Sequence, residues 1–355
     1  MLFSQSKQLV GLDIGTSAVK VCQLKESGGS FQLVHADVKA LDPEVIVDGT
    51  VMDAERVVSA IRELYRENKI KVKNVALSVS GISVIVKKIN LPEMTEDELD
   101  ESIQWEAEQY IPFDIDDVNI DYQILRPVGD GSNRQMEVLL VAVKKDKINE
   151  YTSLVEEAGL KPVIVDVDAF TLENMYEINY ELSRDEAVAL IDIGAGLMNI
   201  NVILDGTSAF TRDISIGGNN FTEAIQKEFG LSFDDAERVK KGEDVEGAAF
   251  QEVVPMLESV SDDIASEILR SFDFFRATAS KSASQISRVM LSGGAANMKG
   301  LREYLAKHLG MEVSIVNPFQ NIEILEGSFD FDFIQNIAPT AAVGVGLALR
   351  RVDDR

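Results

Sequence analysis

Along most of the chain, segments with the hydrophobic pattern of a strand alternate with segments that have the pattern of a helix. Residues 53–68 form one predicted helix, and residues 72–79, rich in Val with Leu and Ala, form a predicted strand. This alternation is typical of an α/β fold, in which helices cover the faces of a sheet.

One hydrophobic pattern occurs twice, far apart in the chain. Residues 9–24 read LVGLDIGTSAVKVCQL, and residues 188–204 read VALIDIGAGLMNINVIL. In each copy an apolar strand ends in Asp-Ile-Gly, a turn of small residues follows, and a second apolar strand leaves it, which is the pattern of a β-hairpin. The repeat predicts a duplicated, two-lobed protein.

A segment with a different order of elements lies between the two copies. It begins with a strand at 83–89 and a helix at 95–110, whose start is marked by Thr95 and Glu98 in the spacing of a capping box. Two strands and a helix follow, and we interpret the segment as an inserted α+β subdomain. The predicted boundaries are 1–80 and 166–187 for the first lobe, 81–165 for the insertion and 188–355 for the second lobe, with 221–285 as its helical part.

Composition narrows the possible partners and the location. A chain of 355 residues with 45% hydrophobic residues can bury the cores of two lobes, and its formal charge of −26 argues against binding to nucleic acid or to anionic lipid. Cys22 is the single cysteine, so neither an intrachain disulfide nor a zinc site of paired cysteines is expected. The longest apolar run, 341–349, is too short to span a bilayer, and we expect a cytoplasmic protein that reaches the membrane only through a partner.

The repeated hairpins carry the candidate chemistry. Asp13 and Asp192 occupy equivalent positions, where two carboxylates can hold the water shell of a magnesium ion, and Lys20 on the departing strand can reach a phosphate oxygen. Small residues in the turns let backbone amides approach a phosphate closely. The predicted phosphate-binding turns are Gly15, Thr16 and Ser17 in the first hairpin, and Gly194, Ala195 and Gly196 in the second. A single Asp-x-Gly is more often only a turn, but two copies in register favour a site.

Three further features are weaker on their own. Gly293, Gly294 and Ala295 follow a predicted strand at 286–290 and can pass close to an adenosine, although strand, turn and helix is a common connection. Gly217 and Gly218 open another predicted helix. Glu237 and Lys240 lie one turn apart on a predicted helix, where the simplest account is a solvated ion pair.

The order of these motifs resembles that of the superfamily of actin, the heat-shock chaperone ATPases and the sugar kinases. The resemblance implies an actin-like fold, in which two ribonuclease H-like lobes arise by duplication, and it implies ATP with magnesium as the ligand. It assigns 13–20 and 192–196 to the two phosphate motifs and 293–294 to the adenosine turn. Glu237 and Lys240 match the helix that flanks the adenosine, and 341–349 matches the second connecting helix, where Gly344 and Gly346 allow close lobe packing. No G-x-x-x-x-G-K-[ST] loop is present, which excludes a P-loop ATPase.

Within the superfamily, the position of the insertion is similar to that in FtsA and PilM. Residues 104–114, QWEAEQYIPFD, and the N-terminal residues 2–20 resemble the PilM family, and the chain lacks the C-terminal amphipathic membrane helix of FtsA. This resemblance implies a scaffold of type IV pilus assembly and twitching motility, located at the inner membrane through the N-terminal tail of PilN and contacting pilus motor ATPases. A role in type II secretion stays open.

The same resemblance gives candidate partner residues on the predicted helix 95–110. Trp105 lies opposite the apolar stripe of this helix, where it either packs against the neighbouring lobe or contacts a partner. Tyr110 and Phe113 complete the set.

The expectation for ATP hydrolysis depends on the segment 165–170. There the superfamily places the residue that orients the attacking water, and only Asp166 or Asp168 is available, so we expect slow hydrolysis at most. Either aspartate can instead cap the following helix. A small-molecule kinase and an FtsA-like filament-forming protein are the alternatives to a scaffold.

Overall fold

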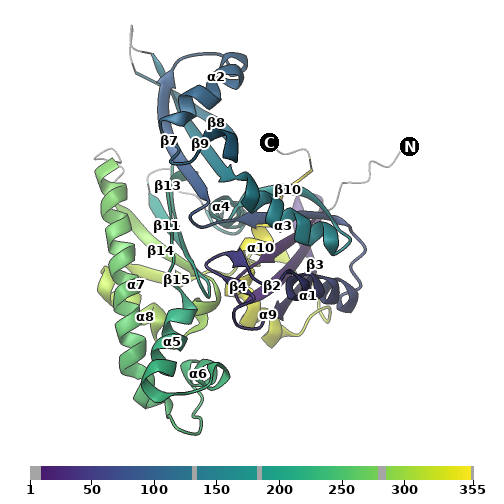
Figure 1. The fold of residues 1–355 in the computed structure, drawn as a ribbon, viewed down its shortest axis with the longest axis vertical. Coiled ribbons are helices and arrows are strands. Elements are labelled where there is room, and N and C mark those ends of the chain that lie inside the picture. Colours follow the sequence, from purple (N-terminus) through teal and green to yellow (C-terminus); the bar gives the residue numbers. More distant parts are fainter. Residues whose placement is uncertain (1–8, 130–133, 182–185, 279–284, 353–355) are drawn as a thin grey trace.

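The two hairpins begin two sheets that share one topology (Figure 1). A computed structural model describes residues 9–129, 134–181, 186–278 and 285–352. In this part of the chain the first sheet has the order β10-β6-β1-β2-β3-β16 and the second the order β13-β12-β11-β14-β15. Each sheet contains an antiparallel unit of three consecutive strands followed by two parallel strands, which confirms the duplication. The strands are β1 (Val10–Ile14), β2 (Ala18–Ser27), β3 (Ser30–Ala40), β6 (Asn74–Val79), β10 (Lys161–Val167) and β16 (Ile322–Glu323), and β11 (Ala187–Ile193), β12 (Met198–Leu204), β13 (Thr207–Ile214), β14 (Ile286–Ser292) and β15 (Glu312–Ile315).

Alternation along the strands sends side chains into different cores. On β11, Ala189 and Ile191 enter the core under the helices of the second lobe, whereas Val188 and Leu190 enter the core between the two lobes. Both faces of the sheet are therefore covered. This explains why the strand reads as a continuous apolar run rather than as an alternating one.

Helices form three layers around the sheets. Two cover the outer face of the first sheet, two lie between the sheets, and four cover the outer face of the second. In Figure 1 the long helix α7 runs along one side of the second lobe. The helices are α1 (Ala54–Glu67) and α3 (Lys145–Glu157); α4 (Asp168–Asn179) and α10 (Ala342–Ala348); and α5 (Gly218–Phe229), α6 (Phe233–Lys240), α7 (Phe250–Thr278) and α8 (Leu301–Leu309).

The two helices between the lobes touch at glycine. A Cβ added to Gly346 of α10 would lie 1.9 Å from the Thr171 carbonyl oxygen of α4, and one added to Gly11 of β1 would lie 2.3 Å from the Gly344 carbonyl oxygen. No larger side chain fits either position without a backbone shift. The predicted helix at 341–349 is thus confirmed as α10, with Gly346 at a close contact, whereas a Cβ on Gly344 would lie at an ordinary 3.5 Å from the Cys22 Cβ.

The insertion is a three-stranded sheet with one helix on it, at the top of Figure 1. Its strands are β7 (Val84–Pro92), β8 (Val118–Val128) and β9 (Gln135–Lys144), in the order β7-β9-β8, and its helix is α2 (Glu96–Glu108). Thr95 and Glu98 form the predicted capping box. Leu99, Ile103 and Ala107 bury the apolar stripe of α2 in a separate core.

Two predicted boundaries need correction. The insertion ends at β9 and not at residue 165, because α3 buries Val155 in the core of the first lobe and β10 pairs with β6. The second lobe does not extend to residue 355, because β16 pairs with β3 and the final helices, with α9 (Phe331–Ile337), pack on the first sheet. The hydrophobic pattern of the sequence predicts where such elements lie in the chain, but it does not determine which sheet they join. Among the described residues, no helix is both long and apolar enough to cross a membrane.

Candidate functional site

The turns of the two hairpins face each other across the boundary between the lobes. Both close in the same way, through a hydrogen bond from Gly15 N to the Ala18 carbonyl oxygen (3.0 Å) and from Gly194 N to the Leu197 carbonyl oxygen (2.8 Å). A Cβ added to Gly196 would lie 3.1 Å from Thr16 Oγ1. The structure therefore brings together the two turns predicted to bind phosphate.

Three carboxylates gather beneath these turns. Burial raises the pKa of Asp168 to about 7 and that of Asp192 to about 6, and in both cases the nearby Asp13 carboxylate adds to the shift. Lys20 donates a hydrogen bond to Asp13 (2.8 Å). Burial alone would lower the pKa of Lys20, but attraction to Asp13, Asp168 and Asp192 outweighs it and raises this pKa. One ammonium thus faces three carboxyl groups, and the cluster suits a divalent cation.

The donor set fits a magnesium ion that is held through water. All three acidic side chains offer hard oxygen atoms, and Asp13 and Asp192 approach from different lobes. Among the described residues, no three His, Cys, Asp or Glu side chains are arranged to ligate a metal directly. Bound phosphates and water would complete the coordination.

Of the two aspartates offered for the water-orienting role, Asp168 joins this cluster. Asp168 begins α4, and Ser78 and Ser80 donate hydrogen bonds to its carboxylate. Asp166 is one strand position before Val167, whose backbone N–H donates to it, and it forms an ion pair with Arg350 Nε (3.4 Å). Asp166 therefore lies near the end of β10 and anchors the C-terminal segment through Arg350, whereas Asp168 lies at the start of α4.

The raised pKa of Asp168 predicts a stability gain from Asp168→Asn. In the unfolded chain this carboxyl ionises near pH 4, whereas in the folded protein it holds its proton until about pH 7, so its ionisation opposes folding progressively between these values. We expect the variant to be more stable by roughly 1 to 3 kcal/mol near pH 8, with a smaller gain near pH 5.5. Urea unfolding at the two pH values measures this, and a gain that grows as the pH falls would contradict the assignment.

Gly217 and Gly218 support the second turn. The first two backbone amides of α5 donate hydrogen bonds to carbonyl oxygens of this turn. Gly218 N donates to the Gly194 carbonyl oxygen (2.9 Å) and Asn219 N to the Ala195 carbonyl oxygen (2.8 Å). A Cβ on Gly217 would lie 2.6 Å from both carbonyl oxygens. The helix end thereby fixes the conformation of the Gly194–Ala195 turn.

The third glycine turn lies against the second hairpin. Gly293 has a φ of +87°, and a Cβ there would lie 2.3 Å from the Ile193 carbonyl oxygen, so only glycine fits. Its N–H donates to the Pro339 carbonyl oxygen (2.8 Å), and the preceding Ser292 donates to Asp192 (2.8 Å). Gly294 faces open space, as a ligand-contacting turn requires.

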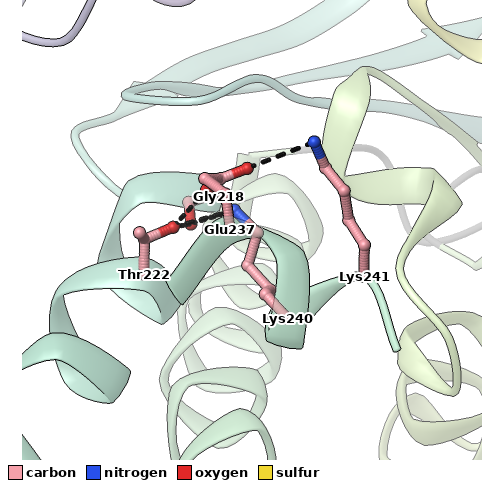
Figure 2. A network of polar contacts seen from close by, with 5 residues as sticks. All are labelled: Gly218, Thr222, Glu237, Lys240 and Lys241. Atoms are coloured by element: carbon pink, nitrogen blue, oxygen red, sulfur yellow. Dashed lines mark hydrogen bonds and ion pairs between the residues drawn. The ribbon is translucent and has the colours of Figure 1, made fainter. Parts of the chain in front are cut away.

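Glu237 and Lys240 form a buried network and not the solvated ion pair that was the simplest expectation (Figure 2). Lys240 Nζ donates to the Gly218 carbonyl oxygen (3.1 Å), to Thr222 Oγ1 (2.9 Å) and to Glu237, which also accepts a hydrogen bond from Thr222. Burial lowers the pKa of Lys240. Burial acts to raise the pKa of Glu237, but the Lys240 ammonium and the Thr222 hydrogen bond outweigh it and lower this pKa. The network ties α6 to the start of α5, directly behind the second turn.

Lys240→Met is therefore expected to destabilise the protein by about 2 to 4 kcal/mol, because it leaves Glu237 partly buried without its main partner. Lys241→Met is the matched control, since Lys241 is exposed and approaches Glu237 only at 3.5 Å; its change should stay within about 0.5 kcal/mol. Urea unfolding compares the two variants, and equal losses would show that the buried contacts of Lys240 contribute nothing specific.

Comparison with known proteins identifies the family. A family model described as type IV pilus assembly protein PilM matches residues 11–352. The chain belongs to the PilM family. A solved PilM-PilN type IV pilus biogenesis complex matches 98% of this chain and 99% of the other, with 29% identity and a TM-score of 0.85.

More distant matches share the fold or part of the sequence. The structure of MreB 5 of Spiroplasma citri bound to AMPPNP matches with a TM-score of 0.55 and 15% identity, over 96% of this chain and 95% of the other, which shows the actin-like fold. FtsA of Escherichia coli strain K12 is 29% identical over 276 residues, which is 72% of this chain and 64% of FtsA. The chain thus spans just under two thirds of the length of FtsA.

In this PilM family member, the surface of the insertion decides between the two interpretations of Trp105. The side chain is 78% exposed on α2, so it does not pack against the neighbouring lobe. Tyr110 and Phe113 are half-buried against the core of the insertion, and Lys144 Nζ lies 4.4 Å from the centre of the Phe113 ring. Trp105 is the exposed aromatic of the predicted set.

Several residues of the site were not found from the sequence. Ser78, Ser80 and Ser292 hydrogen-bond the clustered aspartates, and Asp213 of β13 accepts a hydrogen bond from Gly81 N (2.5 Å) at the junction of the insertion with the second lobe. Ser292 directly precedes the third glycine turn, which was a usable signal. The other three have no local pattern, because only the sheet order places them beside the site.

Proposed function

We propose that this protein is a nucleotide-binding scaffold of type IV pilus assembly. It binds magnesium-ATP between its lobes, binds the N-terminal cytoplasmic tail of PilN, and so links the inner-membrane complex to cytoplasmic motor ATPases. It works in the cytoplasm, at the membrane only through PilN. The observation that carries the nucleotide part is the meeting of two phosphate-type turns from different lobes above Asp13, Asp168 and Asp192.

In this proposal, different residues of the site bind different parts of the nucleotide. Lys20 and the amides of the two turns would hold the phosphates, Asp13 and Asp192 would hold the magnesium water shell, and the Gly293–Gly294 turn would contact the adenosine. A magnesium ion supplies positive charge that offsets the phosphates. Because each lobe provides one turn, the nucleotide favours a particular lobe arrangement, and a partner that prefers the same arrangement is coupled to it reciprocally.

Hydrolysis is slow at most in this proposal. Asp168 is the acidic residue at the place of the water-orienting group, and a carboxyl with a pKa of about 7 is only partly ionised at neutral pH. It is also held by two serine hydrogen bonds, which restrict its reach toward a water molecule. Steady turnover faster than about once per second would contradict the proposal.

The placement of Asp168 also supports a second candidate, a small-molecule kinase of the same fold, because this carboxylate can act as a general base beside the two turns. Transfer of phosphate from ATP to sugars, glycerol or acetate tests the kinase. Nucleotide-dependent light scattering tests a filament-forming protein.

The scaffold itself is tested by calorimetric titration with the N-terminal tail peptide of PilN from the same organism, with and without magnesium-ATP. The solved complex that this chain resembles contains PilN. We expect binding in at least one nucleotide state, and Trp105→Ala should weaken it about tenfold or more, as loss of an exposed aromatic anchor does. Phe331→Ala is the matched control, because Phe331 is similarly exposed on α9, outside the insertion.

Three outcomes are informative. Equal effects of the two variants would remove Trp105 from the binding surface. Absence of binding in both nucleotide states would contradict the scaffold. Binding that is equal in the two states would leave the scaffold in place without the nucleotide switch.

A further inference from the structure

An apolar groove lies outside the nucleotide site and the insertion. It has a volume of about 680 Å³ and runs between the end of β15, the segment that follows β16, and α9. Val316, Phe319 and Ile334 line it from the core between the lobes, where they are almost fully buried. In Figure 1, α9 lies near the lower part of the molecule and α2 at the top.

The groove concentrates exposed apolar side chains. Among the residues whose side chains are described, ten large hydrophobic residues are exposed, and three of them, Ile315, Leu325 and Phe331, line this groove. Phe331 is 71% exposed and Leu325 50% exposed. Single exposed apolar residues are ordinary, but a cluster of them around a concave surface is typical of a binding site.

The wall of the groove is already ordered. Gly327 takes a φ of +78° in the turn after Leu325, Ser328 Oγ donates to the Leu325 carbonyl oxygen (2.6 Å), and Asp330 caps α9 by accepting from Phe333 N (2.8 Å). These local contacts hold Leu325 and Phe331 on the rim. A preformed groove spares a ligand the entropy of ordering it.

The charge at the rim identifies the occupant. Glu326 and Asp330 line the groove, exposed Glu323 and Asp332 lie beside them in the chain, and none of the lining residues is Lys or Arg. A second copy of this chain, at −26, and an anionic lipid surface would both be repelled. A segment with apolar and basic side chains has the complementary chemistry.

We propose that this groove binds a segment of a partner protein that carries two or more apolar anchors flanked by Lys or Arg. The apolar anchors replace water over Leu325 and Phe331, and the basic residues pair with the acidic rim. The surface is separate from Trp105 and from the rest of the insertion, where the PilN tail is proposed to bind. The proposal goes beyond the scaffold function above and does not depend on it.

The test uses the full chain and two fluorescent synthetic peptides of about four helical turns, roughly 14 residues each. They share the same apolar residues, and one carries Lys where the other carries Glu. We expect the Lys peptide to bind at least about tenfold more tightly than the Glu peptide. Leu325→Ser combined with Phe331→Ser, and separately Glu326→Lys, should each weaken the Lys peptide about tenfold or more.

Two matched controls separate groove binding from attraction to an acidic protein. Trp105→Ser removes a similarly exposed aromatic side chain from the insertion. Glu228→Lys makes the same charge change as Glu326→Lys, at an exposed residue of α5. Both control variants should bind the Lys peptide within about twofold of the unchanged protein. Melting temperatures confirm that every variant is folded. Loss of PilN-tail binding with Trp105→Ser and loss of Lys-peptide binding with the groove variants would occur independently.

Four results would overturn the proposal. They are no binding of the Lys peptide at about 1 mM, equal binding of the two peptides, affinity that the groove variants leave unchanged, and concentration-dependent self-association that the Phe331→Ser change abolishes. The last result would assign the groove to contacts between copies of this chain.

Discussion

Asp13→Ala should abolish the thermal stabilisation that is expected from the proposed binding of magnesium-ATP. Ligand at about a hundred times its dissociation constant stabilises a folded protein by roughly 2.7 kcal/mol, and this gain requires a formed site. Without Asp13 the site loses a carboxylate for the proposed magnesium water shell, and Lys20 loses the partner that holds it at 2.8 Å. Differential scanning fluorimetry with and without magnesium-ATP measures the change.

Asp263→Ala is the control for this variant, because Asp263 is an exposed aspartate on α7, outside the candidate site. It should retain the full thermal shift. The ligand-free melting temperature of Asp13→Ala shows whether the variant is folded, since removal of one carboxylate from a crowded acidic cluster should not destabilise the protein strongly. A folded Asp13→Ala protein with an unchanged shift would place the nucleotide elsewhere.

Gly346→Ala should produce the largest loss of stability. The added methyl group would lie 1.9 Å from the Thr171 carbonyl oxygen, and both atoms belong to the close contact between α10 and α4. Backbone cannot rotate away as a side chain can, so the helices must separate, and we expect a loss of about 3 kcal/mol or more. Urea unfolding gives the free energy of unfolding directly.

Gly344→Ala in the same helix is the matched control. Its added Cβ would lie 3.5 Å from the Cys22 Cβ, which is ordinary van der Waals contact. Both changes raise intrinsic helix propensity by about 1 kcal/mol, so their difference isolates the packing at Gly346. Similar stability of the two variants would show that α10 and α4 separate here without a penalty, and would contradict the close contact.

The turns of the candidate site could be predicted because their residues lie within local patterns. The Asp-Ile-Gly turns are short hairpins, whose form depends on neighbouring residues alone, and both appear at the predicted positions with the same turn hydrogen bond. The capping box of α2 and the glycines of the connecting helix are equally local. Duplication added the expectation that two such turns meet, which the contact between Thr16 and Gly196 confirms.

The remaining properties depend on which elements become neighbours. Strand pairing and core packing assign α3, β10 and β16 to the first lobe, contrary to the predicted boundaries. No sequence pattern within these segments shows which of the two sheets they join. Lys240, expected to form a surface ion pair with Glu237, is buried in the structure. Trp105, for which packing against the neighbouring lobe was one expectation, is exposed. The choice of Asp168 over Asp166 likewise followed from the end of β10 and the start of α4. The sequence by itself determined the local turns, caps and helices, because these depend on contacts between residues close in the chain. The tertiary structure decided burial, charge pairing and lobe boundaries, because these depend on contacts between residues far apart in it.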